Sequence, residues 1–172
     1  LQGWYVGDDS DRGTGTSYLG NTTGVNTFRL RRAEIKLSGK ITRAWGFEVM
    51  FDPAKTQSYS GGADDKILQD LAVSFIGLKG HELAMGQKKI ALTEEGLRSS
   101  SELDFAERSR IARVVGDQRQ AGLFYKGELG QRFGALASFT NGTPSNTNDD
   151  NDGLFSAARF DFKPMRGMVL GL

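Results

Sequence analysis

The chain of 172 residues contains no cysteine, only three prolines and a single histidine, His81. The lack of cysteine excludes disulfide frameworks, thiolate zinc sites and cysteine nucleophiles. A single histidine removes most histidine-based metal sites, and we expect His81, in a short turn beside Glu82, to be solvated. No apolar run approaches the ~18 consecutive residues that a transmembrane helix needs. We therefore predict no catalytic residues and no cofactor.

The sequence also has no clear excess of positive or negative charge. Lysine and arginine number 22, aspartate and glutamate 21, and the formal net charge is +1. A dedicated nucleic-acid binder carries a marked basic excess, so we expect no nucleic-acid partner. The chain begins at Leu1 without a charged segment and apolar core of the signal-peptide kind, which leads us to expect a mature or partial chain.

The strongest pattern that is present has a period of two. From Arg32 to Ile41 every second residue is apolar or glycine, and the residues between them are charged or polar. Successive side chains of a strand point to opposite faces, so this segment predicts a strand with one apolar and one charged face. The same alternation recurs in the segments 45–52, 70–77, 120–129, 132–139 and 154–163. The sequence therefore predicts an all-β, antiparallel fold.

Long and short connections alternate between these segments. The long polar connections are 7–27, 53–66, 89–118 and 141–153, and the short ones are 42–44, 78–81, 130–131 and 163–166. An outer-membrane β-barrel has this arrangement, because its periplasmic turns are short and its external loops are long. Its strands are apolar toward lipid and polar toward the lumen, and about 9–11 residues cross the membrane.

We therefore predict that residues 1–172 form a single, partial antiparallel transmembrane β-barrel domain in the bacterial outer membrane, with the four long connections outside. Eight strands can be read, namely the six alternating segments, the opening segment 1–6 and the segment 82–88 between two connections, and residues 167–172 begin a ninth. Because an open sheet edge in hydrocarbon leaves N–H and C=O groups without partners, we expect the chain to be part of a larger barrel.

Several segments, in order along the chain, resemble the phosphate-selective porin O and P family. The sequence FRLRRAEIKLSG at 28–39 resembles the family's F-R-R-A-R-L-x-L-x-G strand, and WGFEVMFD at 45–52 resembles its W-x-Y-x-x-x-F-D segment. Further similar segments are MGQKK at 85–89, SSSELDFAERS at 99–109 and RFDFKP at 159–164. The resemblance implies a sixteen-stranded barrel, usually a homotrimer, that passes anions through a constriction lined by arginine and lysine.

On this topology 89–118 is the third external loop, which in general porins folds into the lumen. Its length supports that role, since structureless connections beyond about 12–15 residues are usually functional. In it Arg108, Arg110 and Arg113 follow a half that is rich in acid, with Glu94, Glu95, Glu102 and Asp104. We predict Arg108, Arg110, Arg113, Glu102 and Asp104 as the pore constriction, since fixed charges at a narrow point select ions by sign. The predicted pore-wall cations are Arg32, Lys36, Lys88, Lys126, Arg132 and Arg159.

Two features limit what the family resemblance implies. The family's phosphate-binding members place a lysine just after the Ser-Ser pair, whereas Ser99 and Ser100 are followed here by Ser101 and Glu102. The strand charges assigned to the lumen are also nearly balanced. We therefore expect a mild anion preference, with phosphate as one candidate solute.

A partial calcium motif lies in the last long connection. Asn148, Asp150 and Asp152 keep the spacing of a calcium-binding loop, but Arg159 stands where that loop has its bidentate glutamate. We interpret the segment as a solvated acidic loop and keep a weak external calcium site as the alternative.

The predicted function is passive conduction of small anions or other hydrophilic solutes by a porin that contacts outer-membrane lipid and lipopolysaccharide. Electrostatic and steric filtering at the loop constriction would set selectivity. Two alternatives remain open: a barrel that serves as scaffold or anchor in a larger envelope assembly, and a soluble all-β binding module. The scaffold would conduct little, and the soluble module would need no detergent for extraction.

Overall fold

The computed structural model describes residues 2–6, 27–56, 67–99, 102–105, 107–149, 152–165 and 168–171. The predicted loops 7–27 and 53–66 therefore lie mostly outside the described residues. The chain divides into two compact units, Leu1–Lys36 with Met50–Leu68, and Leu37–Val49 with Gln69–Leu172. No helix in the described parts of the chain is long and apolar enough to cross a membrane.

The first unit contains an antiparallel strand pair. Strand β1 (Gln2–Val6) pairs with β2 (Thr27–Arg32), and the 3-10 helix η1 (Pro53–Thr56) follows later in the chain. The buried Asp52 accepts hydrogen bonds from the backbone N–H groups of Ala33 (2.9 Å) and Ala54 (3.2 Å).

The prediction of one continuous strand from Arg32 to Ile41 is wrong in one detail. The alternating segment from Arg32 to Ile41 is not one strand, because β2 ends at Arg32 and β3 (Ile35–Lys40) begins three residues later. The N–H of Ala33 donates to the Asp52 carboxylate and so takes no part in a strand ladder. A tertiary contact therefore interrupts a pattern that the local sequence would continue.

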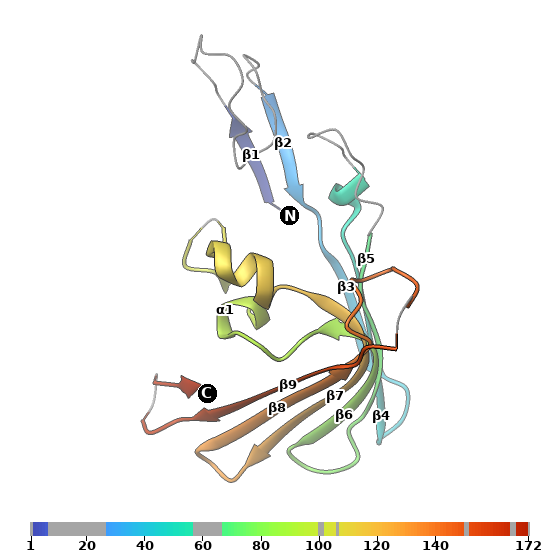
Figure 1. Cartoon of the computed structure of the whole chain (residues 1–172), viewed down its shortest axis with the longest axis vertical. Helices are drawn as coiled ribbons and strands as arrows, with labels where there is room; N and C mark the ends of the chain where they lie inside the picture. The colour runs from blue at the N-terminus through green and yellow to red at the C-terminus, as the bar shows by residue number, and fades with distance from the viewer. Residues whose placement is uncertain are drawn as a thin grey trace. The chain divides into compact units, whose positions relative to one another are not determined.

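An eight-stranded sheet dominates the structure (Figure 1). Its order is β10-β9-β8-β7-β6-β5-β4-β3, so every strand lies beside its neighbours in sequence, as in an antiparallel meander. The strands are β4 (Trp45–Phe51), β5 (Leu68–Phe75), β6 (His81–Lys89), β7 (Arg119–Leu129), β8 (Phe133–Thr140), β9 (Phe155–Phe162) and β10 (Leu170–Gly171). The all-β prediction is confirmed, and the sheet is open at β3 and β10.

The two faces of this sheet reverse the usual distribution of polar and apolar residues. One face, here called the apolar face, exposes large hydrophobic side chains: Leu71, Val73, Leu83, Met85, Leu123, Phe139 and Phe160. The opposite face, here called the polar face, buries Asp70, Ser74, Ser138 and Arg159. Contiguous exposed apolar surface marks contact with lipid or protein. This distribution is the one expected when the apolar face meets lipid.

Aromatic side chains gather near the short turns. Trp45 lies edge-on to Phe75 with ring centroids 5.3 Å apart, and Phe133 stacks on Phe162 at 5.0 Å. The expectation for His81 is wrong, because the ring is half-buried and its Nδ1 lies 2.8 Å from the Tyr125 hydroxyl. These contacts fit an aromatic belt at a membrane interface.

Candidate functional site

The connection between β6 and β7 folds back over the polar face of the sheet. Figure 1 shows this segment on one side of strands β6 to β9, with the short helix α1 (Glu94–Leu97) and the one-turn π-helix η3 (Ala112–Gly116). Although it joins β6 to β7, it reaches β8 and β9. The N–H of Ala91 lies 3.4 Å from Ser138 Oγ, and Glu94 forms an ion pair with Arg159.

The loop has a defined local structure because α1 is capped and packed. Thr93 is its N-cap, with Oγ1 accepting from Gly96 N at 3.1 Å, and Glu94 and Glu95 lie in the first turn. A polar N-cap and acidic residues at this end both stabilise a helix. A Cβ atom on Gly96 would collide with the Gly116 carbonyl, so these glycines allow α1 and η3 to pack closely.

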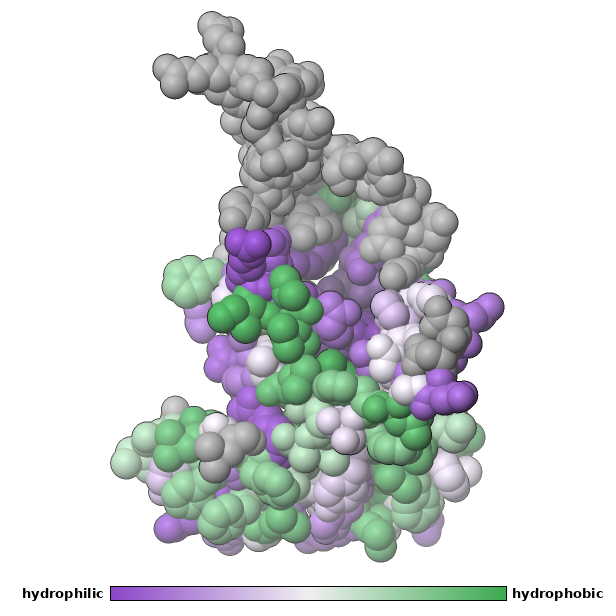
Figure 2. Space-filling model, in the orientation of Figure 1, coloured by the Kyte–Doolittle hydropathy of each residue, from purple (hydrophilic) through white to green (hydrophobic). Residues whose placement is uncertain are grey.

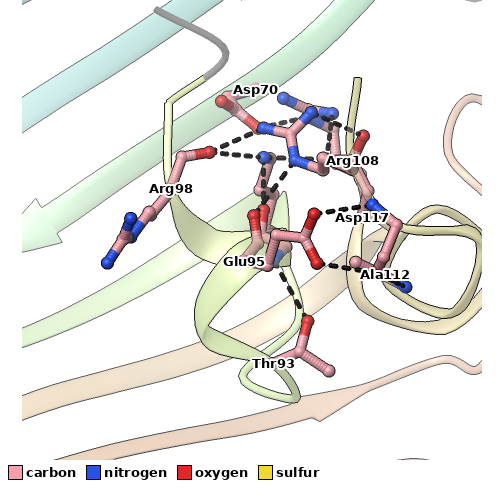
Figure 3. A network of polar contacts seen from close by, with 11 residues as sticks. Asp70, Thr93, Glu95, Arg98, Arg108, Ala112 and Asp117 are labelled. Carbon is pink, nitrogen blue, oxygen red and sulfur yellow. Dashed lines mark hydrogen bonds and ion pairs between the residues drawn. The ribbon is translucent and has the colours of Figure 1, made fainter. Parts of the chain in front are cut away.

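Arg108 joins the two halves of the loop (Figure 3). Its Nε donates to the Glu95 carbonyl at 3.1 Å, and its Nη2 donates to the Arg98 carbonyl at 2.6 Å. Its Nη1 lies 3.3 Å from Oδ2 of Asp117, and the side chain is only 2% exposed. A cation near the free carbonyls at a helix C-terminus satisfies them and complements the helix dipole.

Asp117 connects this arginine to the sheet. Its Oδ1 lies 2.8 Å from Lys89 Nζ and 3.8 Å from Arg119 Nη1. Arg119 in turn places Nε 2.8 Å from Oδ1 of Asp70 on β5, and these two side chains are 9% and 10% exposed. We call Asp70, Lys89, Arg108, Asp117 and Arg119 the loop anchor. It ties the folded loop to β5, β6 and β7.

A second contact closes the loop on itself. Ser109 donates both its N–H and its hydroxyl to the Glu95 carboxylate, each at 2.6 Å. These hydrogen bonds lower the pKa of Glu95 from its usual value, because they favour the charged form of the carboxylate.

The predicted constriction residues take different positions. Arg108 is buried in the loop anchor, whereas Arg110 is exposed on the loop and Arg113 is half-buried. Glu102 and Asp104 are both exposed, and Asp104 lies 3.3 Å from Arg98.

The predicted pore-wall cations also differ in their partners and exposure. Arg159 is buried against Glu94 and Asp161, and Lys88 lies 3.3 Å from Glu82. The remaining four differ in exposure: Arg32 is half-buried, and Lys36, Lys126 and Arg132 are exposed.

The comparison with known families settles the class of protein. The family model of phosphate-selective porin O and P matches residues 12–172. The chain belongs to this family. No curated protein matches the chain. The family consists of outer-membrane porins of bacteria, so the predicted family and the outer-membrane location are confirmed, and the family is one of channels and not of enzymes.

Sequence reasoning missed most of the porin's loop anchor. Lys89, Asp117 and Arg119 stand at the two ends of the loop, and Lys89 and Arg119 are register partners on β6 and β7. The sequence contained a signal for this anchor, because three charged residues flank the long loop at the ends of the two strands that it joins. Asp70 carried only the weaker signal of a carboxylate on a polar strand face.

The alternative calcium site was predicted in the connection 141–153. Asn148 and Asp152 are exposed, and Asp150 lies outside the described residues. Within the parts of the chain that the structure describes, no three acidic or histidine side chains gather as a metal site.

The Glu95–Ser109 contact predicts a pH dependence for the porin's loop. Because the pKa of Glu95 is lowered in the folded loop, its stabilising effect is complete above the usual value and is lost as pH falls through the lowered value. We expect open-channel current noise to rise as the pH falls from neutral to below the usual pKa of a glutamate side chain. A Glu95→Gln variant should be noisy already at neutral pH and change little on acidification. Equal noise at both pH values in the unmodified porin would contradict the prediction.

Proposed function

We propose that this porin passively conducts small hydrophilic solutes with a mild anion preference, and that the loop between β6 and β7 forms its constriction. The supporting observation is the path of this loop, which lies over the polar face and is held to β6, β7 and β9 by ion pairs. Arg119 of β7 is paired in turn with Asp70 of β5. In a barrel whose polar face lines the lumen, a loop held in this way narrows the aqueous path.

The charges of the loop and of the strands support a mild anion preference. Arg108, Arg119 and Arg159 lie against carboxylates, so their charges are largely compensated. In the described part of the chain, Arg110 and Arg132 are exposed and have no ion-pair partner. These free cations favour anions, and exposed carboxylates such as Glu102 and Glu128 oppose the effect. Phosphate is one candidate among small anions.

The proposal includes a closed barrel in the membrane. The sheet is open at β3 and β10, and unpaired strand edges are costly in hydrocarbon, which supports completion by further strands. The family resemblance implies sixteen strands and a homotrimer, and we include both in the proposal. The apolar face would then contact lipid, lipopolysaccharide or neighbouring subunits.

Reversal potential in a planar bilayer tests the proposed function. We expect the purified porin to form stable channels, and a KCl gradient to give a small offset of anion-selective sign. Added phosphate should reduce the chloride current only at concentrations comparable to chloride if the preference is mild. A protein that is folded and heat-modifiable on a gel but electrically silent would contradict conduction and favour the scaffold alternative.

A further inference from the structure

Arg159 is held by carboxylates from two parts of the chain. On β9 its Nε lies 2.7 Å from Oδ1 of Asp161, two residues further along the same strand face. Its Nη2 lies 2.8 Å from Oε2 of Glu94, the first residue of α1. The Arg159 side chain is 9% exposed, and that of Glu94 is 50% exposed. A planar guanidinium suits this role because it offers several donors in fixed directions.

The neighbouring strand leaves room for this guanidinium. Gly171 of β10 is the register partner of Asp161. A Cβ atom at Gly171 would lie 2.5 Å from Arg159 Nη2 and 3.0 Å from Asp161 Oδ1. Any larger residue would displace the guanidinium, so the lack of a side chain at Gly171 allows Arg159 to lie between the two carboxylates.

The ion pair between Glu94 and Arg159 differs from the loop anchor in where it holds the loop. The anchor joins the loop to β5, β6 and β7, the strands around its own base. Arg159 holds the N-terminal end of α1 to β9, two strands away from β7 in the sheet. A loop that is fixed at its base alone could tilt, whereas a second contact at a distance fixes its projection.

We propose that Arg159 is a positioning residue, and that its ion pair with Glu94 is a strut that sets the width of the constriction. The inference rests on the proposed function, in which this loop is the constriction. Arg159 then acts through geometry and does not attract anions as a free cation, because two carboxylates compensate its charge.

Single-channel recordings of Glu94→Gln and Arg159→Gln separate the strut from a simple charge effect. If the pair is a strut, both variants free the N-terminal end of α1 and raise conductance, by roughly two-fold. If the residues act as independent charges, the variants shift ion selectivity in opposite directions and leave conductance nearly unchanged. The double variant should match either single variant, because two changes that break one interaction are not additive. Lys79→Gln is the control, since it removes an exposed turn cation that has no ion-pair partner among the described residues.

A cross-linking experiment replaces the strut covalently. The chain has no cysteine, so Glu94→Cys with Arg159→Cys introduces the two thiols that a short bis-maleimide can join. We expect this double variant to conduct like the Gln variants before cross-linking and to return toward the unmodified conductance afterwards. Glu94→Cys alone, treated in the same way, should not return.

The outcomes distinguish the strut from the proposed function. If the unmodified porin formed no conducting channel, the proposed function would be overturned. Normal conductance in the unmodified porin, with Glu94→Gln unchanged in conductance, would overturn the strut alone. Because Glu94 lies on the exposed side of α1, this variant tests the proposal even if Arg159→Gln does not fold.

Discussion

Replacing Met85 with arginine is expected to destabilise the folded porin by about 2–4 kcal/mol, the cost of an arginine on the lipid face near the bilayer midplane. Met85 lies in the middle of β6 and is 70% exposed on the apolar face, beside Leu83 and opposite Leu123. An exposed methionine side chain has no energetic cost in lipid, but a charged side chain at this position would have no water around it. Urea unfolding in lipid vesicles, followed by tryptophan fluorescence, measures the change.

The matched control places arginine on the opposite face. Glu128→Arg introduces the same side chain at an exposed position of β7 that alternates with the apolar residues Leu123, Tyr125 and Leu129. We expect its stability to remain near that of the unmodified porin, since water reaches this side chain. Equal stability of the Met85→Arg and Glu128→Arg variants would show that the apolar face does not meet lipid.

The second large effect is expected at Arg108. Arg108→Ala removes the donors to the Glu95 and Arg98 carbonyls and one cation beside Asp117. Removing one partner of a buried ion pair costs about 3–5 kcal/mol, and the remaining contact of Asp117 with Lys89 places this variant toward the lower end. We expect the loop to open, with increased conductance and rapid cleavage of the loop by trypsin in detergent.

Arg110→Ala is the control for this effect. It lies two residues away on the same loop, is exposed, and has no ion-pair partner within the described ranges. We expect it to leave trypsin resistance unchanged and to shift the reversal potential toward lower anion selectivity. If Arg108→Ala also changed only the reversal potential, Arg108 would be a pore-lining charge and not part of the anchor.

The sequence was sufficient for the faces and the topology of the sheet. Alternation depends only on neighbouring residues, so the exposure of Leu71 and Val73 and the burial of Asp70 and Ser74 follow from the period of two. The family was also identifiable, because each of its motifs is a short run of neighbouring residues. These features are local, and a local pattern can be read without knowing the fold.

The contacts of the loop depended on residues far apart in the chain. Arg108 appeared with Arg110 as part of a basic cluster, but its donors go to backbone carbonyls, which no side-chain spacing reveals. Arg159 was predicted to be a pore-wall cation. Its partner Glu94 lies 65 residues earlier in the chain, and no local pattern links the two residues. The break between β2 and β3 has the same cause, since Asp52 takes the N–H of Ala33 from 19 positions away.

Thiol labelling along β7 in membranes tests the central claim most directly. The chain has no cysteine, so single cysteines at positions 123, 125, 126 and 128 can be compared without background. If the polar face lines an aqueous pore and the apolar face meets lipid, a charged maleimide should label Lys126→Cys and Glu128→Cys rapidly and Leu123→Cys and Tyr125→Cys slowly. Equal labelling at all four positions, or the reverse order, would contradict the account of this protein as a membrane-spanning porin.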